Sequence, residues 1–109
     1  MQGEAQGAME GWIYSSYRGE PDMEEILPFF VDELSATQAA LSRFAQAKDI
    51  DSLRKEAHKL RGSAGGYGFQ GLSELAGRLE DSCKISTRDE SMILRNVDEL
   101  LDHLSKVRL

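Results

Sequence analysis

The sequence predicts an all-α protein, folded as an antiparallel four-helix bundle. Leu, Ala, Glu and Arg are plentiful and β-branched residues rarely occur in runs, a composition that favours helices. Four segments carry apolar residues at steps of three and four, which is the period of one helix face, and short connections separate them. A chain of 109 residues is long enough for one domain with a hydrophobic core.

The N-terminal segment differs from the rest of the chain. The first residues, "MQGEAQGAMEG", are polar and Gly-rich, so we expect a flexible leader or linker remnant over 1–11 and the bundle domain over 12–109. The next segment, "WIYSSY", places Trp12, Ile13 and Tyr17 where they can form one short apolar face. This pattern permits a short extra N-terminal helix that covers one end of the bundle.

The first bundle helix is expected to start within "PDMEEILPFF". Asp22 is suited to the N-cap, and Glu25 stands three residues later, as in a capping box. Pro28 removes a backbone donor, so we expect it to kink or reset the helix near its first turns. The helix then runs to about Ala47, with an apolar stripe of Leu27, Phe30, Leu34, Thr37, Leu41 and Phe44.

Three further stripes define the other helices. Asp49 can cap the second helix, whose stripe is Leu53, Ala57, Leu60, Ala64 and Tyr67. The third stripe is Phe69, Leu72, Leu75, Ala76, Leu79 and Cys83. The segment "KISTRDES" indicates a loop in which Ser86 or Thr87 could cap the last helix. The last stripe is Ile93, Leu94, Val97, Leu100, Leu101, Leu104 and Val107.

Composition and charge exclude several classes of binding partner. The net charge of −6 disfavours free-standing nucleic-acid binding, so we expect no nucleic-acid partner. The lone Cys83 cannot form an internal disulfide, and no cysteine–histidine spacing indicates zinc, so we expect no metal site. No apolar run approaches the roughly 20 residues of a membrane span, and no signal-peptide pattern opens the chain. We therefore expect a cytoplasmic protein without direct membrane contact.

One histidine, His58, lies outside the apolar face of its helix. Successive helical residues are about 100° apart, so His58 cannot share the centre of the face made by Ala57, Leu60 and Ala64. Its neighbours one turn away are Arg54, Lys55, Arg61 and Gly62. From 54 to 61 the chain carries four basic residues and one acidic residue, although it is acidic overall. A solvated helix flank or an anion site around the imidazole would account for this charge.

Three glycines follow His58 in the same helical pattern, at Gly62, Gly65 and Gly66. Each interior helix glycine costs up to about 1 kcal/mol relative to alanine, so together they cost roughly 2–3 kcal/mol. Close packing against a neighbouring helix, or an earlier helix end at Gly65, could account for them. Gly62 fits that account least, because it shares a ridge with His58 and leaves space for a bulky group. Gly68 is suited to end the helix.

The stretch "AHKLRGSAGGYGF" closely resembles the signature of histidine phosphotransfer (Hpt) domains of multistep two-component phosphorelays. The positions that carry the resemblance are His58, Leu60, Arg61, Gly62 and Gly68. Two flanking segments are similar as well, "DMEEILPFFVDEL" to the second helix of the family and "GLSELAGRLE" to the helix after the motif. The resemblance covers the chain from about Asp22 to its end and implies a four-helix bundle.

The resemblance also implies roles for individual residues. His58 would be the phospho-accepting residue, Arg61 the phosphate-side cation and Gly62 the residue that leaves clearance. Glu80 stands near the position where the family often has a Gln that orients the imidazole, which makes it a candidate for that role. The face toward the phosphate and the receiver would consist of Lys55, Lys59, Arg61, Gly62 and Gly65.

The implied function is that of a phosphorelay intermediate. A phosphoryl group would arrive from the phospho-aspartate of a receiver domain and leave to another response-regulator receiver. A hybrid sensor histidine kinase is a further expected partner, and the cytoplasmic domain could itself be part of such a membrane-anchored kinase. Such a domain lends a nucleophile without completing a catalytic site, so we expect no enzyme, no cofactor of its own, and magnesium in the partner receiver. We expect a monomer.

The residues leave two other functions open, an autonomous enzyme and an interaction bundle. An autonomous enzyme would need a second titratable group that reaches His58. Only Glu80 or a neighbour on the adjacent helix could serve, and no nucleophile–base pair is recognisable.

The second histidine, His103, lies beside the last apolar stripe and is expected to be a partly exposed flank residue. The stronger alternative is a degenerate Hpt-like adaptor bundle that docks receiver or kinase domains without carrying phosphate. The presence of His58, Arg61 and Gly62 together weighs against it.

Overall fold

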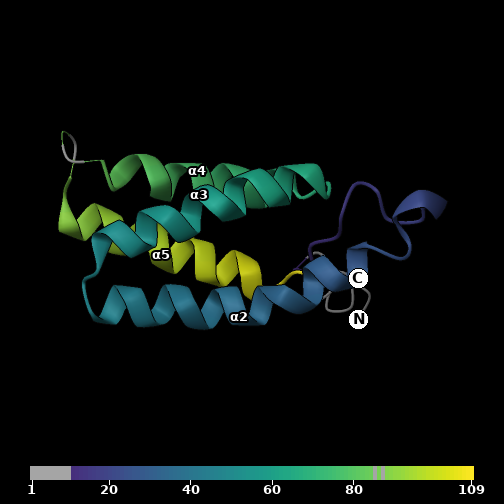
Figure 1. The fold of residues 1–109 in the computed structure, drawn as a ribbon, viewed down its shortest axis with the longest axis horizontal. Helices are drawn as coiled ribbons and strands as arrows, with labels where there is room; N and C mark the ends of the chain where they lie inside the picture. The colour runs from purple at the N-terminus through teal and green to yellow at the C-terminus, as the bar shows by residue number, and fades with distance from the viewer. Residues whose placement is uncertain (1–10, 85, 87) are drawn as a thin grey trace, which may run out of the picture.

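The computed structural model describes residues 11–84, 86 and 88–109, and within them the chain forms four α-helices. These are α2 (Leu27–Gln46), α3 (Ile50–Gly66), α4 (Gln70–Ser82) and α5 (Glu90–Ser105), and the short 3-10 helix η1 (Pro21–Met23) precedes them. Figure 1 shows that successive helices run in opposite directions along one axis. The predicted all-α antiparallel four-helix bundle is confirmed.

The predicted apolar stripes form the core. Each helix packs against its neighbours in the order α2, α3, α4 and α5, and α5 closes the bundle against α2. The stripe residues that become fully buried include Leu41, Leu53, Leu72, Leu79, Cys83, Ile93 and Leu100. At one end of the core the ring of Phe30 stacks on Tyr67 and Phe69, with centroids 4.7 and 5.6 Å away. The period of the sequence therefore identified the buried side of all four helices.

The helix starts agree with the sequence only in part. Asp49 caps α3 as predicted, because its carboxylate accepts a hydrogen bond from the backbone N–H of Ser52. The prediction of Ser86 or Thr87 as the last cap is wrong for the described residue Ser86, and Thr87 lies outside the described residues. Asp89 caps α5 instead, since it directly precedes the helix and its carboxylate accepts from the N–H groups of Ser91 and Met92.

The predicted start of the first helix at Asp22 is also wrong. The segment after Glu20 forms η1 and a turn, and α2 begins only at Leu27, with no side-chain cap at Ile26. Pro28 lies in the first turn of α2, where the backbone N–H groups have no intrahelical partner. A missing donor costs nothing there, so Pro28 starts the helix rather than kinking it.

The predicted extra helix at "WIYSSY" does not form; a segment with one β-bridge and a turn over 16–19 replaces it, and we call residues 12–20 the N-terminal strap. Ile13 makes a parallel bridge to Val107, with its N–H donating to Lys106 O and its carbonyl accepting from the N–H of Arg108, both at 2.8 Å. Figure 1 shows this segment at the end of the bundle where α3 and α5 finish. The leader expected over 1–11 lies, except for Gly11, outside the described residues.

The strap also closes the end of α3 at Gly68. The Ser15 hydroxyl donates to the carbonyl of Tyr67 at 2.6 Å, and the N–H of Ser16 donates to the carbonyl of Gly68 at 2.9 Å. Gly68 has a φ of +83° directly after the C-cap of α3, which confirms the predicted helix stop. A Cβ at this position would lie 2.5 Å from the Ser15 Oγ and 2.9 Å from the Ser16 Oγ.

Gly68→Ala should lower the free energy of unfolding by about 2–4 kcal/mol, because it combines left-handed backbone strain with displacement of the strap. Urea unfolding followed by circular dichroism measures the change. Gly66→Ala is the matched control, since its Cβ would meet nothing within 4 Å. Equal midpoints for the two variants would show that the strap does not depend on a bare Gly68.

His103 is half-buried beside the last stripe, as predicted, and among the described residues its Nε2 has no hydrogen-bond partner. Burial, with a smaller contribution from the Lys106 charge, lowers the pKa of His103 below its ordinary 6.5, although the Asp102 carboxylate acts in the opposite direction. The unfolded chain therefore takes up this proton at a higher pH than the folded chain does.

The free energy of unfolding is accordingly expected to fall as the pH drops through 6.5. Urea titrations at about pH 7.5 and about pH 5.5 measure this fall, which should be smaller in His103→Gln than in the parent. An identical pH dependence in the two proteins would contradict the assignment to His103.

Candidate functional site

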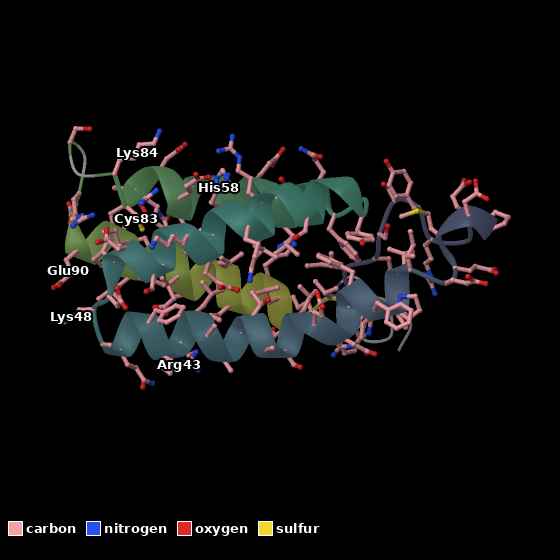
Figure 2. The ribbon with its side chains drawn as sticks, in the orientation of Figure 1. Arg43, Lys48, His58, Cys83, Lys84 and Glu90 are labelled. Atoms are coloured by element: carbon pink, nitrogen blue, oxygen red, sulfur yellow. The ribbon has the colours of Figure 1, made fainter. Side chains whose placement is uncertain are left out.

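His58 projects from α3 into solvent. The neighbouring stripe residues Ala57 and Leu60 are buried, whereas 74% of the His58 side chain is exposed, as the helical phase predicted. Figure 2 places it over α3 and α4, on the side of the bundle away from Arg43 of α2. The buried face of α3 packs in the core, so the opposite face presents the imidazole to solvent and leaves the ring accessible.

The structure brings Glu80 of α4 directly to His58. The Nδ1 of His58 lies 2.7 Å from Oε2 of Glu80, and Nη1 of Arg61 lies 3.2 Å from Oε1 of the same carboxylate. Only 13% of the Glu80 side chain is exposed, against 53% for Arg61. Each oxygen of one largely buried carboxylate therefore has its own basic partner on α3.

The protonation of this pair determines which imidazole nitrogen is reactive. Burial by itself would raise the pKa of Glu80, but hydrogen bonds from His58 and Arg61, and their charges, hold the pKa below its ordinary 4.5. The carboxylate is thus ionised near neutral pH and can only accept hydrogen bonds. The proton of a neutral imidazole must then lie on Nδ1, which leaves the lone pair on Nε2.

The other predicted site residues fall into two groups. Lys55 is exposed on the same helix, and the exposed Lys59 lies 3.8 Å from the carboxylate of Glu56, whose side chain is 16% exposed. A Cβ at Gly62 would meet nothing within 4 Å, so packing does not account for this glycine. A Cβ at Gly65 would lie 3.4 Å from the Ser73 Oγ. This is ordinary van der Waals contact, so the packing of α3 on α4 does not by itself require a glycine at this position.

Two residues of α4 that the sequence did not single out support the site. The hydroxyl of Ser73 donates to the backbone carbonyl of Arg61 at 2.8 Å, and Gly77 is buried beneath the Arg61 side chain. Together with Glu80 they follow at steps of four and three on the face of α4 that meets α3. In the sequence, two small residues and a carboxylate at this helical spacing are the pattern that could have indicated a face of α4 in contact with the site.

A family model of the Hpt domain matches residues 25–108, which span all four helices. The chain belongs to the Hpt domain family. Hpt domains are phosphotransfer modules of two-component systems, are not classical enzymes, and interact with response-regulator receivers in phosphorelays. Comparison with curated proteins found no match, and neither did comparison with solved structures. The N-terminal strap precedes the segment that matches the Hpt model.

Over residues 11–84, 86 and 88–109, no three His, Cys, Asp or Glu residues gather where they could hold a metal ion. In the same ranges, no helix has both the length and the apolar character needed to cross a bilayer.

Proposed function

We propose that His58 accepts a phosphoryl group from the phospho-aspartate of a receiver domain and passes it to another response-regulator receiver. The observation that carries the proposal is the exposed imidazole whose Nδ1 is held by an ionised carboxylate. A nucleophile for transfer between two proteins must be accessible and correctly oriented, and this arrangement meets both conditions.

In the transfer step the lone pair of His58 Nε2 forms the new nitrogen–phosphorus bond. The bond between phosphorus and the aspartyl oxygen breaks, and the receiver carboxylate leaves with its electron pair. The ring, which keeps its Nδ1 proton, then carries a positive charge that is delocalised over both nitrogens. The Glu80 carboxylate, 2.7 Å from Nδ1, offsets this charge. Transfer to the next receiver is the same displacement in reverse.

The charges and the open backbone around His58 fit this step. Lys55, Lys59 and Arg61 are cations on the same helix, and they would attract both the phosphoryl group and the acidic pocket of a receiver. Gly62 leaves room for the phosphoryl donor to approach in line. In this proposal the domain needs no cofactor of its own, and magnesium is supplied by the receiver. A hybrid sensor histidine kinase is the proposed upstream partner.

The test is incubation of the domain with a receiver that carries phosphate on its aspartate. Label on the Hpt domain should be labile in acid and stable in base, the behaviour of phosphohistidine, and should map to the peptide that contains His58. Label that survives acid, or binding of the receiver without any label, would refute the proposal. The second of these results would instead support the adaptor that docks receivers without carrying phosphate.

A further inference from the structure

Gly77 lies on the interior side of α4, directly beneath the side chain of Arg61. A Cβ on Gly77 would lie 3.2 Å from Nε of Arg61, 3.4 Å from Cδ and 3.5 Å from Cζ. These distances are at or below ordinary van der Waals contact. The side chain of Arg61 therefore rests against the bare backbone of α4 on its way to Glu80.

The backbone of α4 does not itself require glycine at this position. Gly77 lies inside a regular helix, and the glycines with positive φ in the described chain are Gly19 and Gly68. In a helix interior glycine is less favourable than every residue except proline. The contact with Arg61 is the feature that glycine provides and alanine would disturb.

Arg61 is held at both of its ends by α4. Its backbone carbonyl accepts a hydrogen bond from the Ser73 hydroxyl at 2.8 Å, and its Nη1 lies 3.2 Å from Oε1 of Glu80. The Gly77 contact lies between these two attachments, because Ser73, Gly77 and Glu80 follow one face of α4 at steps of four and three. The path of the arginine side chain is thus defined along its whole length.

We propose that Gly77 is a positioning residue for the phosphotransfer site. Its missing side chain lets Arg61 lie against α4 and bind one oxygen of Glu80, which directs the other oxygen at Nδ1 of His58. A role of Gly77 in phosphotransfer rests on the proposed function of His58. The effect of Gly77 on the orientation of Glu80 and His58 can be measured without any phosphate.

The first measurement is nitrogen NMR of His58 at a pH where the ring is neutral, which reports the tautomer of the imidazole. Gly77→Ala and Gly77→Leu should lower the share of the ring that carries its proton on Nδ1, in order of side-chain size. When Arg61 is displaced, it no longer binds Oε1 of Glu80, so Oε2 of the same carboxylate is held less firmly at Nδ1. Gly66→Ala is the matched control, because it adds the same atom to a helix without a contact within 4 Å.

The second measurement is phosphorylation by phosphoramidate, a small donor that needs no partner protein. The Nε2–phosphorus bond forms as the phosphorus–nitrogen bond of the donor breaks and ammonia leaves. Gly77→Leu is expected to slow this reaction by about fivefold, the size of one lost ion-pair contact. Gly66→Ala should react at the parent rate.

Repeating both measurements in an Arg61→Ala background separates a positioning role from a merely structural one. If Gly77 acts through Arg61, the Gly77 substitutions change nothing further in that background. The proposal is overturned if Gly77→Ala and Gly77→Leu both match the parent, or if their effects persist without Arg61. Should the leucine variant fail to fold, the alanine variant carries the same comparison. Failure of phosphotransfer at His58 would appear in the receiver assay and leave these NMR results unchanged.

Discussion

His58→Gln is expected to carry no acid-labile label after incubation with a phosphorylated receiver. Glutamine keeps a polar side chain of similar reach, and its amide N–H can still donate to Glu80. It has no nitrogen lone pair available for attack, because the amide nitrogen is conjugated with its carbonyl. Autoradiography after base treatment, together with recovery of the unlabelled peptide that contains position 58, measures the loss.

The matched control is His103→Gln, which removes the other histidine of the chain. His103 is half-buried on α5, far along the sequence from the exposed imidazole on α3, so its loss should leave labelling at the parent level. Label retained by His58→Gln, or lost equally in the two variants, would be incompatible with a single phospho-accepting histidine at position 58.

Arg61→Glu should reduce the rate of phosphotransfer by about 100-fold, which corresponds to about 2–3 kcal/mol of lost transition-state stabilisation. The substitution removes the cation that binds Oε1 of Glu80 and places a second carboxylate beside the first. Like charges there repel each other, the orientation of Glu80 is lost, and the approaching phosphoryl group meets negative charge. Rapid-quench kinetics with a phosphorylated receiver gives the rate.

Arg95→Glu on α5 makes the same charge change at an exposed position on another helix. Its rate should stay within about twofold of the parent, because this charge lies on a different helix from His58 and salt screens exposed charges. Similar losses in the two variants would mean that net charge, rather than the arrangement around His58, controls transfer. Raising the salt concentration should narrow the difference between them only in part, since Glu80 is largely buried.

The sequence was most informative where local periodicity controls structure. The stripes identified the core, and the same phase argument placed His58 in solvent, because both follow from the angle between successive residues of one helix. Asp49 was found because an N-cap depends on residues only a few positions away. Asp22 and Glu25 matched a capping box equally well, yet the helix begins at Leu27, where Pro28 fits the first turn.

Contacts between distant parts of the chain could not be predicted in this way. The strap depends on Ile13 pairing with Val107, and no pattern within "WIYSSY" indicates that partner. The same holds for the bond between His58 and Glu80, which are 22 positions apart on different helices. Resemblance to a family suggested an orienting role for Glu80, but only the packing of α3 on α4 places its carboxylate at hydrogen-bond distance.

The hydrogen bond between Nδ1 and Glu80 has a consequence for how a phosphate carrier would work. A phosphoryl group added at Nε2 leaves the Nδ1 proton in place, so the bond at 2.7 Å can persist in the loaded protein. The phosphorylated and unphosphorylated forms of the domain would then share one side-chain geometry at His58, and conversion between them would need no rearrangement of the fold. Flux in either direction would follow the relative abundance of phosphorylated and unphosphorylated partners, as it does for a freely reversible exchange.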